Sequence, residues 1–352
     1  MINYFEMIIK NKIKIFVFFL LIFALKGTFA QSEAGKESFA VLGLYNSAQM
    51  TARGMNFIPR FLNEASSSIA NPSTLNTNLN NMISITYTDI FAGSYQGAIH
   101  YTHTFEKLGN FGFALQYINY GDFLMTESNG DIVGSFSAND YMFNVAWGRQ
   151  IEKNLFLGLN FKPLFSKYES YSSVSFALDV SATWVSPTGS WQVSAAISNL
   201  GRQIQSFASQ RDTLPTDIQI GVSKKLKHAP MIIYVVADNL SKWDIREKDG
   251  LSPRTTTGID GTVNEESSLS AFFDKGFRHL KFAVDILPSQ YFQFSVGYSW
   301  RQRQEMKLDD VFSLTGLSYG LNLNYKNYSL SYARNEYHVY GSPNYLTLSY
   351  RF

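Results

Sequence analysis

The end of the chain, Asn344-Tyr345-Leu346-Thr347-Leu348-Ser349-Tyr350-Arg351-Phe352, indicates how the whole chain folds. Apolar and aromatic side chains alternate with small or polar ones, and the apolar set is Leu346, Leu348, Tyr350 and Phe352. A β-strand places successive side chains on opposite faces, so this segment has one apolar and one polar face. Outer-membrane barrels end on such a strand with a terminal aromatic residue, which their assembly machinery reads. We assign this role to the apolar set.

The same alternation recurs after residue 81. In Phe292–Trp300 every even position is large and apolar, and in Leu155–Phe161 every odd position is. No later segment has about 18 consecutive apolar residues, so no membrane-spanning helix is predicted there. The sequence predicts an all-β fold, a transmembrane antiparallel β-barrel of about 14 strands. The expected strands are 82–90, 96–105, 110–119, 139–149, 153–163, 175–185, 190–199, 216–225, 231–240, 277–287, 290–301, 313–325, 327–334 and 343–352.

The connections between these strands are of two kinds. Bacterial outer-membrane barrels have short periplasmic turns and longer outer loops. If the first strand rises from the periplasm, long and short connections alternate, with 91–95 as the exception. Both chain ends then lie on the periplasmic side. The expected outer connections are 91–95, 120–138, 164–174, 200–215, 241–276, 302–312 and 335–342.

The first residues have the pattern of a cleaved signal peptide. Lys10, Lys12 and Lys14 precede an apolar run at 15–25, and Thr28-Phe29-Ala30 supplies small residues for a peptidase. The run is shorter than the about 20 residues of a membrane-spanning helix. We expect cleavage after Ala30. An uncleaved N-terminal anchor helix is the alternative. The expected organisation is a signal peptide at 1–30, an N-terminal plug segment at 31–81 and the barrel at 82–352.

Residues 31–81 do not alternate. They are polar and rich in small residues, with two candidate short helices, at 47–54 and 64–72. A barrel of about 14 strands has a lumen that is either filled or wet. We therefore expect this segment to fold inward as a plug that includes Asn71 and Pro72. A disordered periplasmic leader is the alternative.

The composition excludes several classes of function. The 352 residues include no cysteine and are 16% charged, against about 25% in soluble proteins, with a formal net charge of +2. Without the signal peptide the chain is near neutral, so nucleic-acid binding is not expected. His100 and His103 face opposite sides of one expected strand and cannot easily share a metal ion. No nucleophile elbow or phosphate loop occurs, so no catalytic residue, metal or cofactor is expected.

The connection 241–276 is the exception among the loops. It contains apolar residues amid many charges, and long loops in compact folds are often functional. Exposed apolar residues indicate either packing within the loop or a protein partner. The candidate partner-binding residues are Trp243, Ile245, Leu251, Phe272 and Phe273.

Several runs resemble the PorV/PorQ family of outer-membrane barrels, in particular the PorQ branch of the type IX secretion system. The resemblance covers nearly the whole mature chain, and its runs are 43–48, 118–123, 136–141, 147–151, 214–230 and 238–244. It implies the fold of long-chain fatty-acid transporters, with 14 strands and an N-terminal luminal segment. Ala70-Asn71-Pro72 corresponds to an Asn-Pro-Ala motif of that family, with Ser73 here in place of the last alanine.

The resemblance also implies partners. PorQ-type barrels anchor the surface protein PorZ in an attachment complex with PorU and PorV, which fixes cargo to surface lipopolysaccharide. The protease of that complex is PorU, so no catalytic role is carried over. We therefore expect a non-enzymatic barrel that anchors a PorZ-like surface partner through its outer loops.

The alternative is an outer-membrane transporter for a hydrophobic small molecule such as a long-chain fatty acid. That function requires a continuous apolar path through the plug and the wall. Expected inward residues such as Gln293, Ser295 and Ser299 are polar, which favours the anchor.

Overall fold

A single closed sheet forms the body of the protein. The computed structural model describes residues 39–91, 93–207, 211–246, 255–257, 263–265, 268–308 and 311–352. Within them, fourteen antiparallel strands close into a barrel, and β10 (Thr255–Thr257) pairs separately with β11 (Val263–Glu265). The barrel strands are β1 (Met82–Phe91), β2 (Ser94–Phe105), β3 (Gly109–Thr126), β4 (Ile132–Glu152), β5 (Leu155–Tyr168), β6 (Tyr171–Val185), β7 (Trp191–Gln205), β8 (Asp217–Lys225), β9 (Met231–Ala237), β12 (Leu280–Ile286), β13 (Phe292–Ser299), β14 (Leu317–Tyr325), β15 (Tyr328–Asn335) and β16 (Asn344–Arg351).

Closure comes from the first and last strands. β1 pairs with β16 from Met82 opposite Arg351 to Asp89 opposite Asn344. Each expected strand corresponds to one of the fourteen, so the predicted fold class is confirmed. Because no strand keeps a free edge within the barrel wall, the backbone hydrogen bonds of the wall are satisfied without water, as a bilayer requires. No helix in the described ranges is long and apolar enough to cross a membrane.

Side chains alternate between the two faces of the wall. Ile85, Leu346 and Leu348 on β1 and β16 are 48–51% exposed on the outer face. Their neighbours point into the barrel, where Ser84 and Thr86 hydrogen-bond to Ser349 and Thr347 at 2.8 and 2.9 Å. The exposed apolar face is the surface that meets lipid. Two other residues of the assigned assembly signal lie at the chain end, where Tyr350 and the 71% exposed Phe352 have ring centroids 4.9 Å apart.

Several expected boundaries differ from those of the structure. The connections at 120–138 and 164–174 are mostly sheet, because β3 pairs with β4 beyond the barrel and β5 pairs with β6 up to Tyr168 opposite Tyr171. The strand expected at 290–301 ends at Ser299, whose side chain caps helix α5 (Trp300–Met306). Helix α4 (Ser268–Arg278) lies in the connection 241–276, where no helix was predicted.

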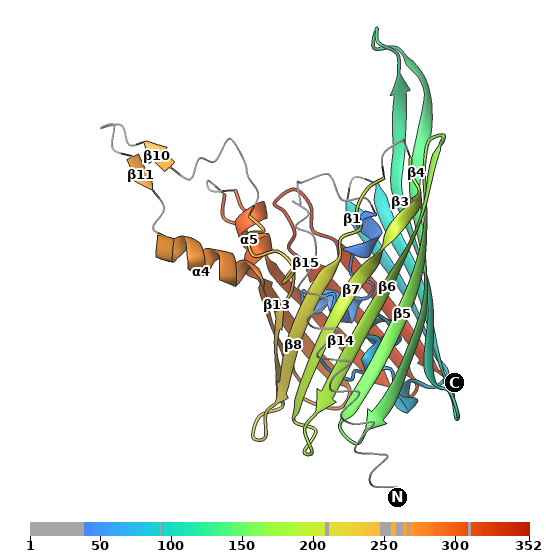
Figure 1. The fold of residues 1–352 in the computed structure, drawn as a ribbon, viewed down its shortest axis with the longest axis vertical. Helices are drawn as coiled ribbons and strands as arrows, with labels where there is room; N and C mark the ends of the chain where they lie inside the picture. Colours follow the sequence, from blue (N-terminus) through green and yellow to red (C-terminus); the bar gives the residue numbers. More distant parts are fainter. Residues whose placement is uncertain are drawn as a thin grey trace, which may run out of the picture.

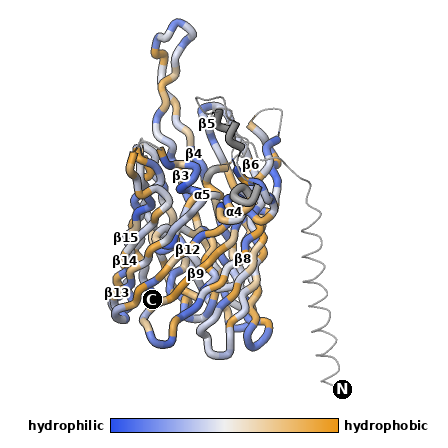
Figure 2. The backbone as a smooth tube through the Cα atoms, turned by 90° about the vertical axis from the view of Figure 1, so that its left-hand side faces the viewer, coloured by the Kyte–Doolittle hydropathy of each residue, from blue (hydrophilic) through white to orange (hydrophobic). Residues whose placement is uncertain are grey.

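The hairpin of β3 and β4 rises far above the rest of the barrel (Figures 1 and 2). A bulge between Asn119 and Asp122 marks the point where the two strands leave the wall. Above it β3 and β4 pair only with each other, because β2 reaches no further than Asn119 and β5 no further than Ala138. The hairpin, α4 and α5 are all at the end opposite the C-terminus, which we take as the outer side.

The N-terminal residues 39–81 lie inside the barrel, and we call them the lumen segment (Figure 1, blue). It packs α2 against β13–β16, α3 against β1–β3, and η2 against β4–β6. Most of its residues from 47 to 60 are buried. The expected signal peptide at 1–30 lies outside the described residues. The elements of the lumen segment are η1 (Ala40–Leu42), α2 (Ala48–Ala52), α3 (Ala65–Ala70), η2 (Pro72–Thr74) and η3 (Thr77–Leu79).

Candidate functional site

A buried ion pair joins the lumen segment to the wall. Arg53 follows α2, and its Nη2 lies 2.8 Å from Oδ2 of Asp285 on β12. Both side chains are fully shielded, at 0% and 1% exposure. Asp285 also accepts hydrogen bonds from Tyr234 and Ser295, each at 2.7 Å, so its two oxygens are satisfied. A desolvated ion pair with these added hydrogen bonds fixes the geometry of this contact.

Ser73, directly after Asn71 and Pro72, forms a second attachment of the lumen segment to the wall. Asn71 donates to the carbonyl of Ile58 at 2.9 Å within the lumen segment. Ser73 bridges to the wall through Thr183, with the hydroxyl oxygens 2.7 Å apart, and its N–H donates to Ser181 at 2.9 Å. The hydroxyl of Ser73 therefore makes a contact with Thr183 that an alanine side chain could not make.

Two inward glycines make room for Pro72. A Cβ on Gly148 or Gly158 would lie within 3.0 Å of Pro72 backbone atoms. Glycine allows this close approach because it has no Cβ. The glycine signal was present in the sequence, since Gly158 stands at an inward position among Leu155, Leu157 and Leu159.

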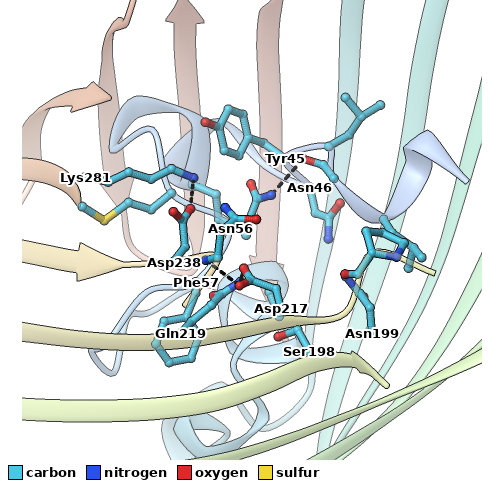
Figure 3. A pocket seen from close by; sticks show the side chains of 18 of the residues that line it. Tyr45, Asn46, Asn56, Phe57, Ser198, Asn199, Asp217, Gln219, Asp238 and Lys281 are labelled. Atoms are coloured by element: carbon cyan, nitrogen blue, oxygen red, sulfur yellow. Dashed lines mark hydrogen bonds and ion pairs between the residues drawn. The ribbon is translucent and has the colours of Figure 1, made fainter. Parts of the chain in front are cut away.

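A cavity of about 350 Å³ lies between the lumen segment and the outer connections, and we call it the outer pocket. Figure 3 shows Tyr45, Asn56, Asp217, Asp238 and Lys281 around it. Residues from α5 and from the outer connections line its outward side. Its apolar lining comes mainly from the lumen segment, where it includes Leu42, Leu44, Met50, Met55 and Phe57.

Two ion pairs place charge in the wall of the outer pocket. Lys281 on β12 lies 2.6 Å from Asp238, and Lys162 on β5 lies 2.6 Å from Asp179 on β6. All four residues line the pocket. An apolar molecule in the outer pocket would have to lie against these charged groups. No sequence pattern had indicated them.

Three of the candidate partner-binding residues form an aromatic cluster on α4, namely Trp243, which precedes the helix, and Phe272 and Phe273 of the helix. The ring centroid of Trp243 is 5.5 Å from that of Phe272, which is 6.0 Å from that of Phe273. These rings are 54–55% exposed, and Ile245 is partly buried. Leu251 lies outside the described residues.

The polar side of α4 holds the helix to the protein. Lys275 lies 2.9 Å from Asp244, and Asp274 pairs with Arg278 at 2.7 Å and accepts from the indole N–H of Trp300 at 3.0 Å. Burial alone would raise the pKa of Asp244, but hydrogen bonds from Lys275 and Arg246 outweigh it and hold that pKa below its usual range. The helix therefore turns its charged residues toward the protein and leaves Phe272 and Phe273 exposed.

The outer hairpin presents a second apolar surface; the connection 120–138 was expected to contribute to partner binding, but none of its residues was singled out from the sequence. We define the hairpin surface as Phe123 and Leu124 of β3 with Ile132 and Val133 of β4, which are 43–65% exposed and are shared between the two faces of the ribbon. These residues lie beyond the last residue pairs that β2 forms with β3 and that β5 forms with β4. The signal was the pair of apolar runs 123–125 and 132–133 inside an expected outer connection.

The structure separates the two histidines considered for metal binding. His100 is fully buried inside the barrel, whereas His103 lies among outward rings and hydrogen-bonds to Asn81 at 2.7 Å. Across the described ranges, no group of three or more histidine, aspartate or glutamate side chains is placed to hold a metal ion.

Comparison with known proteins supports the fold. No protein-family model and no curated protein sequence matches the chain. The toluene transporter TbuX of Ralstonia pickettii aligns over 88% of this chain and 99% of its own, at 9% identity and a TM-score of 0.50. The toluene transporter TodX of Pseudomonas putida aligns over 89% and 98%, at 10% identity and a TM-score of 0.50. CymD, a monoaromatic hydrocarbon channel, aligns over 90% and 99%, at 10% identity and a TM-score of 0.50.

These identities show a common architecture and nothing finer. Together with the closed fourteen-stranded sheet and its apolar outer face, they make this chain an integral outer-membrane β-barrel.

Proposed function

We propose that this barrel is a non-enzymatic anchor that holds a surface protein at the outer membrane. The observation that carries the proposal is the hairpin surface. Above the bulge, β3 and β4 form a two-stranded ribbon that carries exposed Phe123, Leu124, Ile132 and Val133 beyond the lipid-facing wall. A large apolar surface and unpaired strand edges in water favour association with another chain.

The aromatic cluster on α4 supplies a second contact for such a partner. Trp243, Phe272 and Phe273 are exposed at the same outer end as the hairpin surface. The barrel itself provides a fixed position, because extraction would expose its apolar band to water. The lumen segment and its buried ion pair favour a static role for the interior.

The resemblance to PorQ-type barrels suggests the identity of the partner. It would be a surface protein resembling PorZ, in a type IX secretion attachment complex that also contains PorU and PorV and acts at surface lipopolysaccharide. The proposal gives this chain no part in the chemistry of that complex.

The test is a mild-detergent pull-down of the full barrel from native outer membranes, with Leu124→Asp as the variant. We expect the wild-type barrel to recover a PorZ-like protein in stoichiometric amount, and Leu124→Asp to recover much less. Ser128→Asp is the matched control, because Ser128 is exposed in the turn of the same hairpin and the charge there lies outside the hairpin surface. Equal recovery with all three barrels would reject the hairpin surface as the dock.

A second candidate is transport of a hydrophobic small molecule, which the shared fold with TbuX, TodX and CymD favours. The outer pocket would be its entry, but the Lys281–Asp238 and Lys162–Asp179 pairs in the pocket wall disfavour an apolar ligand. Proteoliposome uptake of radiolabelled oleate and toluene separates the two functions. If the barrel takes up either compound and Arg53→Met increases that uptake, the result supports the transporter. If uptake equals that of empty liposomes, the result supports the anchor.

A further inference from the structure

We propose that the outer hairpin binds its partner by strand addition, in which a basic, extended segment of the partner pairs along the free edge of β3. This inference rests on the proposed function and deepens it, because it concerns the same hairpin and names the chemistry of the segment that docks. The ribbon above the barrel has two edges, one on β3 and one on β4 (Figure 1). The backbone groups on each edge decide which of them can accept a further strand.

Two hydrogen bonds fix the direction of the backbone groups in the ribbon. At its base the carbonyl of Ser137 on β4 accepts from the N–H of Glu169 at 3.2 Å, and Glu169 directly follows β5. The backbone groups of Ser137 therefore point away from β3, and so do those of its cross-strand partner Asp122 point away from β4. At the tip the N–H of Glu127 donates to the carbonyl of Asp131 at 2.9 Å, so the groups of Glu127 point toward the opposite arm. The two directions alternate along a strand, and both hydrogen bonds give the same alternation.

The free edge of β3 is regular. By this alternation Asp122, Leu124 and Thr126 present their N–H and C=O groups to it, and we call these three residues the open edge. Above Asn119, where the pairing with β2 ends, no described strand other than β4 pairs with β3. The open edge therefore offers a row of backbone donors and acceptors to an added strand.

The edge of β4 is less suited to pairing. The carbonyl of Ser137 is already bonded to Glu169. Further up, Met125 is opposite Gly134 and Thr126 is opposite Ile132, so β4 carries one extra residue between them. A bulge of this kind interrupts the spacing of an edge, which is one way in which proteins protect edges from pairing. The ribbon is therefore blunted on β4 and left regular on β3.

The charge of the hairpin favours a basic segment. Asp122, Glu127 and Asp131 are exposed, and residues 108–148 include no lysine, arginine or histidine. Complementary charge guides a partner to an interface and rejects wrong ones more than it adds affinity. Like charges opposite each other destabilise paired strands, so the same carboxylates disfavour pairing with the hairpin of a second copy of this chain.

The side chains beside the open edge indicate the pattern of the segment. Phe123 and Met125 share one face of β3, and the ring centroid of Phe123 is 5.3 Å from that of Phe136 on β4. Asp122 and Leu124 lie on the other face. An added strand places its own side chains alternately on these two faces, so apolar residues on one side meet Phe123 and basic residues on the other meet Asp122. The expected occupant is an extended segment in which basic and apolar residues alternate.

Peptide binding to the full barrel tests the proposal. The barrel is purified in lauryldimethylamine oxide, which carries no net charge near neutral pH, and binding is followed by fluorescence anisotropy. One labelled peptide of about eight residues alternates lysine with valine, a second alternates glutamate with valine, and a third is the lysine peptide with every backbone N–H methylated. We expect the first to bind at one site. The second and third should bind at least about tenfold more weakly, because one has the wrong charge and the other cannot donate to the open edge.

The variant is Thr126→Pro, which removes an N–H of the open edge and leaves the hairpin surface intact. Proline is tolerated on edge strands, and its ring prevents pairing at that position. We expect Thr126→Pro to weaken binding of the lysine peptide by about tenfold or more. Ser135→Pro is the matched control, because it places the same ring on the edge of β4, and it should bind the peptide as wild type does. Heat-modifiable migration on gels shows that each barrel is folded.

Four results would overturn the proposal. The lysine peptide could fail to bind the wild-type barrel, or bind Thr126→Pro as tightly as wild type. The methylated or the glutamate peptide could bind as tightly as the lysine peptide, which would exclude strand pairing or charge selection. Finally, light scattering could show wild-type dimers that Thr126→Pro abolishes, which would assign the open edge to a second copy of this chain.

The pull-down from native outer membranes separates this proposal from the anchor function. If Thr126→Pro recovers the surface protein as well as wild type does and Leu124→Asp does not, the anchor stands and strand addition is rejected. If the peptides behave as expected but the wild-type barrel recovers no surface protein, the open edge accepts a basic strand and the anchor function is rejected.

Discussion

Arg53 and Asp285 lie 232 positions apart in sequence, and their charged groups meet at 2.8 Å in the interior of the barrel. The pair joins the lumen segment to β12, and Tyr234 completes the hydrogen bonding of the carboxylate at 2.7 Å. A Cβ on Gly297 would lie within 3.0 Å of the Arg53 backbone, so the wall opposite this contact has to be a glycine. The contact therefore fixes the position of the lumen segment along the barrel axis.

The first prediction concerns this ion pair. Arg53→Met leaves Asp285 as an unpaired buried charge, a change that costs about 3–5 kcal/mol. We expect the lumen segment to open more often, and limited proteolysis of the purified barrel to cleave within residues 39–81 much faster than in wild type. The double variant Arg53→Met with Asp285→Leu should regain most of the protection, since no charge remains buried. Unchanged cleavage in the single variant would show that the pair does not hold the segment.

The second prediction concerns the close contact between Gly158 on β5 and the backbone of Pro72. In Gly158→Ala the new Cβ meets Pro72 backbone atoms that cannot rotate away. Overpacking of this kind costs about 1–3 kcal/mol, and we expect a lower temperature of gel-mobility transition and faster proteolytic cleavage within residues 39–81. Gly97→Ala is the control, because a Cβ there has nothing within 4 Å. If the two variants had the same transition temperature, Pro72 would not pack against Gly158 of β5.

The strands could be predicted because lipid imposes one rule on every strand. Phe294 and Val296 must face outward, so the chain shows a period of two that no distant residue can alter. Outside the membrane that rule ends. Trp300 continues the alternation of β13, yet it begins α5, because Ser299 caps the helix and Gln302 donates to Asn335 at 2.7 Å.

The interior could be predicted only in part. Asn71 and Pro72 stood out through a family resemblance, and Gly158 could have been noticed as an inward glycine. Asp285 was visible as a carboxylate at an inward position of an expected strand, but nothing in its neighbourhood indicates Arg53 as its partner. The residues that line the outer pocket come from many separate elements, so no contiguous stretch of sequence indicates which residues form it.

The third prediction concerns pH and the attachment of α4. Asp244 has a pKa below its usual value of about 3.9, so its contribution to stability is present above that value and is lost as the pH falls through the lower, folded pKa. A spin label on Phe272→Cys is site-specific, because the chain has no native cysteine. We expect constant label mobility from pH 8 to about pH 5 and a rise only in stronger acid.

Asp244→Asn separates this charge effect from general unfolding in acid. It should give a mobile label already at pH 7, because the ion pair with Lys275 is lost. Asp131→Asn, in the turn of the outer hairpin, should behave as wild type. A label that loosens near pH 6 in wild type would contradict the assignment to Asp244.

The fourth prediction concerns Phe352. Its ring is 71% exposed and contacts Tyr350, so little of its surface is buried by the folded barrel. We expect Phe352→Ala to leave the free energy of unfolding of the refolded barrel, measured in urea, within about 0.5 kcal/mol of the wild-type value, as for other surface substitutions. In cells the same change should lower the amount of barrel in the outer membrane several-fold, because we assign Phe352 as the last residue of the assembly signal. Tyr325→Ala is the matched control, since Tyr325 is a 64% exposed aromatic at the same end of the barrel. If both variants reach the membrane equally well, Phe352 acts only as a surface aromatic and the assembly role falls to Leu346, Leu348 and Tyr350.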